Sequence, residues 1–323
     1  MEEIAIIADF KGSGFGFAKK IYEYILKIGE GKISVDLVNI EKAVFKDGEF
    51  KIKIANNVRR KRCFIVYDSN KSPSEWFTEL VFLLEAIRFS SPDEINLVLP
   101  YTRFSRQDRK DSSRVSVNAK ALADVISLYA DSGMTCDLHS GQIQEFFSIP
   151  FDSLFSFPVL IKYLKEKHPE ILEDLVIVSP DLGGGKRVES LSKRLRKQGF
   201  NVNVAFGHKT REKDNEVANI IIIGEVSGKN CLVVDDIIDT GNTMIKTGEI
   251  LIKNGAKKVF AYGTHGLFTE GFDKFKVFDK IIVSDSLFIA NAPDNLEVVS
   301  LVELFGEAIY RTVIGQSLSV LFN

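Results

Sequence analysis

The sequence predicts an α/β protein with two domains, each built on a parallel β-sheet. Short apolar runs alternate with amphipathic segments along the whole chain, which is the pattern of strands joined by crossover helices. Glycine-rich or polar motifs follow many of the apolar runs, at the strand ends where open α/β sheets bind ligands. The alternation falls into two serial blocks, and a length of 323 residues is typical of about two domains.

In the first block, apolar or alternating runs predict strands and amphipathic stretches predict helices. Strands are expected at residues 4–8, 35–40, 49–54, 61–67, 94–99 and 134–138. Helices are expected at residues 18–26, 75–89 and 117–130. The turn dipeptide Asp47-Gly48 separates the second and third strands, and Pro100 ends the fifth.

The second block repeats this alternation after Pro150. Strands are expected at residues 175–178, 202–206, 220–223, 230–234, 257–263, 280–283 and 296–299, and helices at 158–167, 188–197, 244–253 and 301–314. The polar segment from His208 to Glu216 is expected to be a mobile loop. A boundary near Phe155 gives domains of residues 1–155 and 156–307, with residues from about 308 to 323 packing back onto the first domain. We expect ligands between the strand-end faces of the two domains.

The composition is that of a globular protein in a reducing compartment. Apolar residues make up 45% of the chain, and the formal net charge of −2 gives no general attraction to nucleic acid or anionic membranes. No apolar run approaches the ~18 residues needed to span a bilayer. The three cysteines are scattered, which fits neither a disulfide framework nor a zinc site. We therefore expect a cytoplasmic protein without nucleic-acid or membrane partners.

One stretch of the second block has the order expected of a sugar-phosphate site. A short apolar run ends in Asp235 and Asp236, and Asp239 and the turn Thr240-Gly-Asn-Thr243 lead into a predicted helix. Backbone N–H groups and threonine hydroxyls at a helix start can hold a phosphate, whereas the acids suit ribose hydroxyls or a bridging Mg²⁺. The alternative is an acidic strand end with an ordinary capped helix. The stretch resembles the phosphoribosyl-diphosphate (PRPP) loop of phosphoribosyltransferases and PRPP synthetases, two families that the loop alone does not separate.

Other strand-end motifs leave two interpretations open. The basic segment 100–114 can hold phosphate through arginines, or it is a solvated loop. His139 is a candidate phosphate or metal partner, although an isolated histidine is more often structural. The glycines at 183–185 would let a ligand approach the backbone closely. The Gly12–Phe17 stretch approaches a dinucleotide fingerprint, but Phe17 replaces its third glycine, which favours an ordinary strand-to-helix turn.

With these motifs in one chain, the sequence resembles the ribose-phosphate pyrophosphokinase (PRPP synthetase) family along nearly its whole length. Six segments match the family's motifs in the same order: 45–49, 100–110, 137–147, 179–187, 208–211 and 235–243. The resemblance implies two phosphoribosyltransferase-like α/β domains. It also implies the reaction of Mg-ATP with ribose 5-phosphate to give PRPP and AMP.

The resemblance also implies roles for individual residues. The catalytic residues are Lys209 and Arg211, in a loop that closes over ATP. The ATP-binding residues are Phe45, Asp47, Glu49, Arg106, Gln107, Asp108, Lys110 and His139. The ribose-5-phosphate-binding residues are Asp235, Asp236, Asp239, Thr240, Gly241, Asn242 and Thr243. The Mg²⁺ ligands are His139 and Asp181, and an allosteric phosphate site would use Arg59, Arg114, Gln144, Ser317 and Ser319.

In this family a neighbouring subunit supplies the adenine loop, which implies a dimer at least and commonly a hexamer. The sequence departs from the family's pattern at the Gly12–Phe17 turn, at Glu145 where glycine is usual, and at Asn57 where phosphate-regulated enzymes usually carry serine. Two alternatives to the synthetase are a non-catalytic regulatory subunit and a plain phosphoribosyltransferase. A plain phosphoribosyltransferase would lack the ATP-binding segment 100–110 and the whole first domain.

Overall fold

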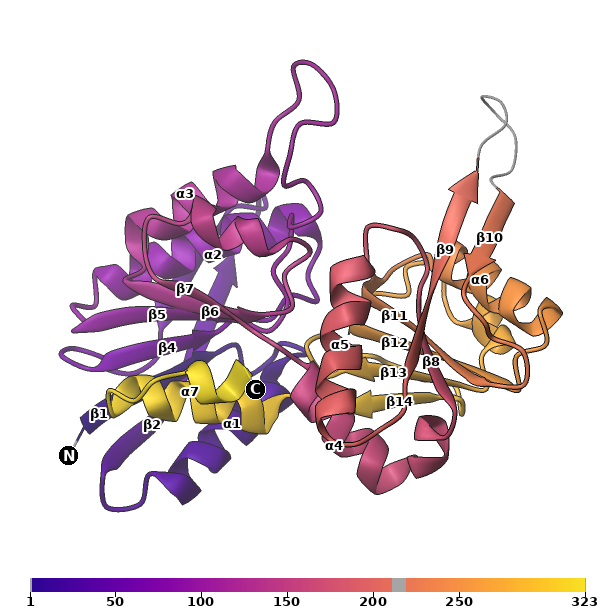
Figure 1. The fold of residues 1–323 in the computed structure, drawn as a ribbon. Coiled ribbons are helices and arrows are strands. Elements are labelled where there is room, and N and C mark those ends of the chain that lie inside the picture. Colours follow the sequence, from indigo (N-terminus) through magenta and orange to yellow (C-terminus); the bar gives the residue numbers. More distant parts are fainter. Residues whose placement is uncertain (1, 211–218, 323) are drawn as a thin grey trace. The chain divides into compact units, whose positions relative to one another are not determined.

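The computed structural model describes residues 2–210 and 219–322. The chain folds into two compact units (Figure 1). The first unit contains residues 2–155, 286–288 and 301–322, and the second contains residues 156–285 and 289–300. The predicted end of the second domain at residue 307 differs from the observed limit at 300. The reason is that the last helix packs on the first unit, where Phe305 meets Phe17 with ring centroids 5.7 Å apart.

The first unit is a seven-stranded sheet with helices on both faces. Its strands are β1 (Glu2–Ala8), β2 (Ile33–Val44), β3 (Phe50–Ile54), β4 (Arg62–Val66), β5 (Glu94–Leu99), β6 (Ser132–Cys136) and β7 (Phe151–Leu154). Its helices are α1 (Phe15–Ile28), α2 (Pro73–Arg88), α3 (Asn118–Tyr129) and α7 (Val302–Val313), with 3₁₀ turns at Gly141–Phe146 and Ser319–Phe322. The strand order is β3-β2-β1-β4-β5-β6-β7, and every pair is parallel except β2–β3.

The second unit is also a seven-stranded sheet. Its strands are β8 (Leu175–Ser179), β9 (Asn203–Thr210), β10 (Asn219–Ile223), β11 (Asn230–Ile238), β12 (Lys258–Gly266), β13 (Lys280–Ser284) and β14 (Leu296–Val299). Its helices are α4 (Phe157–Lys167), α5 (Gly185–Lys197) and α6 (Asn242–Lys253), with 3₁₀ turns at Pro169–Leu172 and Asp273–Val277. The strand order is β10-β9-β8-β11-β12-β13-β14, with β9–β10 the antiparallel pair.

The two sheets have the same strand order, with β8 to β14 in the places of β1 to β7. In each unit the first strand of the chain is an inner strand of the sheet. The next two strands are added on one side of it, and the remaining strands are added on its other side. The strand order therefore reverses between β1 and β4 in the first unit and between β8 and β11 in the second. Ligands of open α/β sheets bind at the carboxyl ends of the strands at such a reversal.

The apolar runs of the sequence form the centre of each sheet, as predicted. Central strands are buried on both faces and are apolar at nearly every position; Ile4, Ile6 and Ile7 of β1 are fully buried. In the first unit α2 and α3 share one core cluster, and Figure 1 shows α1 and α7 on the opposite face. In the second unit α4 and α5 cover one face and α6 the other. The prediction of two parallel-sheet α/β domains is confirmed, with one antiparallel edge strand in each.

Two local predictions were wrong, one at the end of β9 and one at the edge strand β7. The backbone of His208–Thr210, expected as a loop, extends β9, and His208 stands opposite Ile221 of β10. Ladder hydrogen bonds with a hairpin partner therefore outweigh the polar composition of this segment. β7 was not predicted, because its four residues include Asp152 and Ser153 and give little apolar signal.

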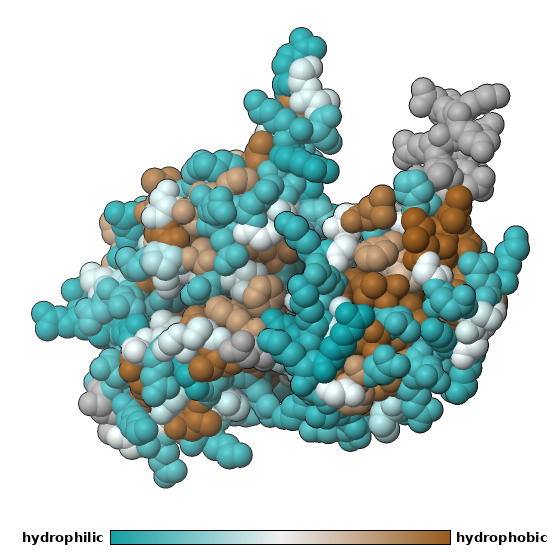
Figure 2. Space-filling view, viewed as in Figure 1, coloured by the Kyte–Doolittle hydropathy of each residue, from teal (hydrophilic) through white to brown (hydrophobic). Residues whose placement is uncertain are grey.

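The face seen in Figure 2 is largely hydrophilic with scattered hydrophobic patches, one of them near the β9–β10 hairpin. The edge strand β10 exposes Ile221 and Ile223 there. Among the helices that the structure describes, none is both long enough and apolar enough to cross a membrane.

Candidate functional site

The predicted sugar-phosphate loop joins β11 to α6 in the second unit. Gly241 is the N-cap of α6 and has a φ of 69°, which a residue with a side chain adopts only at a cost. A Cβ at this position would also lie 2.2 Å from the ring of Phe275. A glycine is therefore required here on two grounds. Glycine has no side chain that could cover the start of α6. The N–H groups in the first turn of a helix have no partner within the helix.

The acids of the same loop have different environments. Asp236 is buried, whereas Asp235 is half-buried beside it. The Asp239 carboxylate accepts a hydrogen bond from the Thr269 hydroxyl, and the Asn242 side-chain oxygen accepts one from Lys274 at 3.0 Å. The structure thus places Asp235 and Asp236 inside β11, which extends beyond the predicted strand end at residue 234 to Ile238. The other predicted ribose-phosphate residues follow in the loop and in the first turn of α6.

Arg187 bridges the two adjacent aspartates. Its Nη1 lies 2.9 Å from Oδ1 of Asp235, and its Nη2 lies 3.0 Å from Oδ1 of Asp236. Burial raises the pKa of Asp235, and the neighbouring Asp236 raises it further, whereas Arg187 lowers it. The guanidinium therefore supplies the positive charge that offsets two carboxylates packed side by side.

Asp181 lies in the loop between β8 and α5, next to this cluster in the sheet order. Its Oδ1 accepts the N–H of Gly184 at 3.1 Å, and its carbonyl accepts the Ser179 hydroxyl at 2.5 Å. A Cβ on Gly184 would lie 2.4 Å from the Ser179 Oγ. The glycine motif therefore folds as a tight turn that fixes Asp181 and starts α5.

The donor set fits Mg²⁺ brought in with a phosphorylated substrate. Within residues 2–210 and 219–322, no group of three or more His, Cys, Asp or Glu side chains could hold a metal ion by itself. Mg²⁺ is usually bound by one or two carboxylates together with substrate phosphates and water. The carboxylate of Asp181 is a hard oxygen ligand of this kind, whereas those of Asp235 and Asp236 are already paired with Arg187.

In the first unit, the segment 45–49, which is the predicted adenine loop, forms the tip of the β2–β3 hairpin. The Phe45 N–H donates to the Glu49 carbonyl at 2.7 Å, and the Glu49 N–H donates to Oδ1 of Asp47 at 3.1 Å. Gly48 takes a φ of 92° to close the turn. The Phe45 side chain is 52% exposed, so the hairpin presents an aromatic ring and two carboxylates to the outside.

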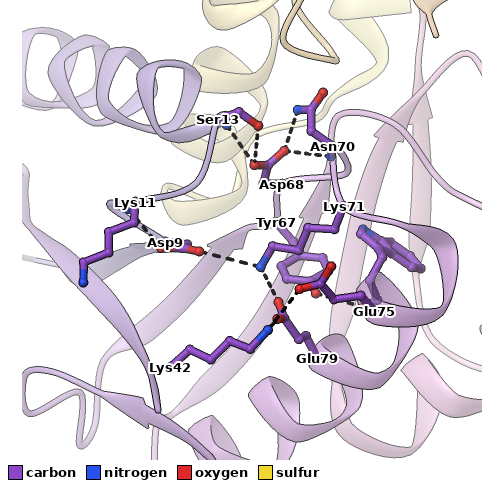
Figure 3. A network of polar contacts seen from close by, with 12 residues as sticks. Asp9, Lys11, Ser13, Lys42, Tyr67, Asp68, Asn70, Lys71, Glu75 and Glu79 are labelled. Atoms are coloured by element: carbon purple, nitrogen blue, oxygen red, sulfur yellow. Dashed lines mark hydrogen bonds and ion pairs between the residues drawn. The ribbon is translucent and has the colours of Figure 1, made fainter. Parts of the chain in front are cut away.

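A polar network fixes the base of this hairpin to α2 (Figure 3). Lys42 of β2 pairs with Glu79, a buried residue of α2, and with Glu75 at 3.0 Å. Lys71, from the loop after β4, pairs with the same Glu79 and lies 3.6 Å from Asp9. Although burial opposes ionisation, the hydrogen bonds from the two lysines hold the pKa of Glu79 below its usual value.

The predicted ATP residues after β5 and β6 lie on loops of the first unit. Arg106 and Lys110 are exposed, whereas Gln107 and Asp108 are half-buried. The Gln107 carbonyl accepts the N–H of Ala119 at 3.1 Å, which ties the loop to the start of α3. His139, in the loop after β6, is exposed.

The predicted allosteric residues are only partly brought together. Ser317 and Ser319 hydrogen bond to each other through their hydroxyls at 2.9 Å. Gln144 accepts the N–H of Ser153 at 3.0 Å instead. Arg59 donates its N–H to the Asn57 side chain at 3.0 Å.

Arg114 is exposed in the loop before α3. The predicted catalytic Lys209 lies in β9, opposite Ile220. Arg211 lies outside the described residues.

Sequence reasoning assigned no role to Arg187, Lys42 or Glu79. For Arg187 a signal existed, because it ends the glycine motif after an apolar run and lies in the first turn of the following helix. For Lys42 and Glu79 no local pattern points to their pairing, since they are 37 residues apart in the sequence.

Comparisons with known proteins agree with this arrangement. The family model described as the N-terminal domain of ribose phosphate pyrophosphokinase matches residues 12–129, and the phosphoribosyl transferase domain matches residues 156–270. The ribose-phosphate pyrophosphokinase of Thermosipho africanus is 39% identical over 305 residues, covering 93% of this chain and 94% of the relative. That of Rhizobium meliloti is 39% identical over 286 residues, covering 86% and 90%.

The fold agrees as well. The crystal structure of phosphoribosylpyrophosphate synthetase from Mycobacterium smegmatis superposes with a TM-score of 0.85 at 26% identity, covering 98% of this chain and 100% of that one. This similarity extends over both units, and the family models match segments of each. The chain belongs to the ribose-phosphate pyrophosphokinase family.

Proposed function

We propose that the chain transfers the β,γ-diphosphoryl group of ATP to the 1-hydroxyl of ribose 5-phosphate, giving PRPP and AMP. The observation that carries the proposal is the segment that runs from the end of β11 into α6. It combines a glycine-started helix, two threonines and an acid pair at the strand-order reversal of the second unit. The first two features bind a phosphate and the third suits sugar hydroxyls.

The transfer itself is an in-line displacement. The ribose 1-hydroxyl oxygen bonds to the β-phosphorus, the bond from that phosphorus to the α–β bridging oxygen breaks, and AMP leaves with its electron pair. The hydroxyl proton is released. Such transfers depend on positioning and charge neutralisation rather than on a covalent nucleophile.

The ribose loop supplies the acceptor. Thr240, Thr243 and the first N–H groups of α6 hold the 5-phosphate, and Asp235 and Asp236 orient the ribose hydroxyls. Asp239, Gly241 and Asn242 shape the turn between them. His139 and Asp181 would hold Mg²⁺ together with the ATP phosphates, and the bound ion would neutralise charge on the diphosphate.

The remaining residues grip the nucleotide and the transferring group. Phe45, Asp47 and Glu49 on the β2–β3 hairpin, with Arg106, Gln107, Asp108 and Lys110, form the nucleotide site. Lys209 and Arg211 stabilise the charge of the group in transfer, which is typically a contribution on the order of 10²–10³-fold in turnover per cation. The residues Arg59, Arg114, Gln144, Ser317 and Ser319 are proposed as an allosteric phosphate site.

We also propose that the protein self-associates as a dimer or hexamer and acts in the cytoplasm. The exposed Val44 and Phe45 at the hairpin tip support self-association, because an aromatic ring on a protruding turn is suited to complete a neighbour's site. Light scattering after size exclusion measures the oligomer directly. A monomer at working concentration would contradict this part of the proposal.

The direct test measures AMP release from Mg-ATP with and without ribose 5-phosphate. We expect release that depends on ribose 5-phosphate and yields PRPP. A non-catalytic regulatory subunit would release nothing, and a phosphoribosyltransferase would consume PRPP only with an added base.

Two variants test the assigned roles. Lys209→Ala should abolish most turnover while changing ribose 5-phosphate affinity little, whereas Asp236→Ala should mainly raise the KM for ribose 5-phosphate. Retained turnover in the first variant, or an unchanged KM in the second, would contradict the role assigned to that residue.

A further inference from the structure

We propose that Arg187 is a built-in counter-ion for the Asp235–Asp236 pair. It holds both carboxylates in position for the ribose hydroxyls and offsets a charge that a divalent cation would otherwise have to balance. The inference rests on the proposed ribose 5-phosphate site and names a positioning residue for it.

The geometry of the contact is that of a planar fork. The two Nη atoms of one guanidinium meet one oxygen of each aspartate, at 2.9 and 3.0 Å. A guanidinium presents its donors in a fixed plane, so the two contacts also fix the carboxylates relative to each other. Oδ1 of Asp235 accepts the Asp236 N–H at 2.9 Å in addition, which holds the pair from the backbone side.

Burial makes the positive charge of Arg187 necessary. The Asp236 side chain is only 3% exposed, and a buried carboxylate without a partner is strongly unfavourable. When both acids are ionised, the cluster with Arg187 carries one net negative charge. Without it, two adjacent carboxylates would remain, and a divalent cation would be the natural replacement.

The backbone explains why this residue reaches the acids. Arg187 lies in the first turn of α5, and its N–H donates to the Gly184 carbonyl at 3.0 Å. The next residue, Val188, is fully buried and anchors the turn in the core. Because β8 and β11 are adjacent parallel strands, the loop that carries Asp181 lies beside the part of β11 that carries the acid pair. The Arg187 side chain therefore couples the β8–α5 loop to β11.

The test compares Arg187→Gln with the wild type, using the full-length protein. We expect the KM for ribose 5-phosphate to rise by about 10-fold or more, as loss of a charged hydrogen-bonding partner usually causes, while the KM for ATP changes little. We also expect the substrate-free variant to bind Mn²⁺ more tightly than the wild type, measured by electron paramagnetic resonance, because two unbalanced carboxylates attract a divalent cation.

Arg196→Gln is the matched control on the same helix. Arg196 donates to the Val202 carbonyl at 3.1 and 2.7 Å and contacts no acid of the site. We expect unchanged KM values and unchanged Mn²⁺ binding in this variant. If Arg187→Gln fails to fold, Arg187→Lys replaces it. It keeps one charge but cannot span both carboxylates in one plane, so we expect a smaller rise in the ribose 5-phosphate KM.

Two results would overturn the proposal. One is an unchanged ribose 5-phosphate KM in the folded Arg187 variant. The other is a parallel rise of both KM values without tighter Mn²⁺ binding, which is the signature of a merely structural ion pair. Absence of ribose 5-phosphate-dependent AMP release in the wild type would instead refute the proposed function, and the Mn²⁺ comparison would still test the counter-ion role.

Discussion

Replacing Glu79 by glutamine should destabilise the first unit selectively. The substitution keeps the shape of the side chain but removes the negative charge shared by Lys42 and Lys71. Glu79 is 2% exposed, so its environment cannot supply water as a substitute partner. The two lysines come from different segments of the chain. When both lose Glu79 as their shared partner, the base of the β2–β3 hairpin is no longer held to α2.

The expected loss follows from the exposure of the partners. Breaking a fully buried ion pair costs about 3–5 kcal/mol. The side chains of Lys42 and Lys71 are 29% and 18% exposed, so both can turn toward water after the substitution. The loss should therefore be nearer that of a single charged hydrogen bond, about 1.5–3 kcal/mol.

The only tryptophan of the chain gives a local probe of this loss. Trp76 is buried in the same unit, one helical turn before Glu79, with its ring centroid 5.5 Å from that of Tyr67. Its fluorescence during urea unfolding reports on the first unit by itself. The matched control is Glu75→Gln, which removes a more exposed partner of Lys42 and should cost less than about 1 kcal/mol.

Two outcomes would refute the reasoning about Glu79. One is a loss below about 0.5 kcal/mol, the usual range for surface substitutions. The other is an equal loss in both variants. The pH dependence gives a further check, because a pKa held below its usual value means that the stabilisation is present at neutral pH and is lost as pH falls through the folded-state pKa. The difference between wild type and Glu79→Gln should therefore shrink in acid.

Three further predictions concern the second unit. Gly241→Ala should cost roughly 2–4 kcal/mol of stability and raise the ribose 5-phosphate KM, because it strains a positive φ and forces the Phe275 ring aside; denaturant unfolding with steady-state kinetics measures both. Burial opposes ionisation of Glu297, but hydrogen bonds led by that from Lys280 hold its pKa at about 2. The resulting stabilisation, about 3 kcal/mol at most, should be present above about pH 4.5 and lost as pH falls toward 2, so Glu297→Gln should flatten the acid limb of a stability–pH curve. Chelation of divalent cations should abolish AMP release without unfolding the protein, as followed by circular dichroism; unchanged release would contradict the proposed role of Mg²⁺.

The sequence sufficed for the centre of each sheet because burial there dictates composition. Strands with both faces covered must be apolar at nearly every position, and the run 94–99 matches the observed β5. The edge strand β7 and the last residues of β9 are set differently. Backbone pairing with a neighbour holds β7 and the end of β9, and that pairing leaves no apolar pattern in the sequence.

The residues of the candidate site also fall into two groups: those that a local sequence pattern predicts and those that only the fold brings together. The ribose loop was predictable because strand, acids, threonines and helix start are contiguous in the chain. The pairing of Arg187 with Asp235 joins residues 48 positions apart, and only the adjacency of β8 and β11 brings them together. Contacts of this kind depend on topology, which local sequence patterns do not contain.

The shared strand order of the two units allows their two strand-order reversals to be compared directly. In the first unit Asp68 follows β4, as Asp235 lies near the end of β11. Its Oδ2 accepts the Gly14 N–H at 2.9 Å and the Ser13 hydroxyl at 3.0 Å. The protein's own carboxylate thus occupies the start of α1, where a diphosphate would have to bind.

The same occupation accounts for the misleading glycine pattern at 12–17. A Cβ on Gly14 would lie 2.9 Å from Cγ of Asp68, so this glycine serves contact with an internal acid rather than with a nucleotide. In the second unit the equivalent loop carries Arg187, which pairs with two acids. Gly241 has no side chain that could cover the start of α6. Equivalent backbones therefore differ in charge balance, and that difference supports the proposal that ribose 5-phosphate binds to the second unit.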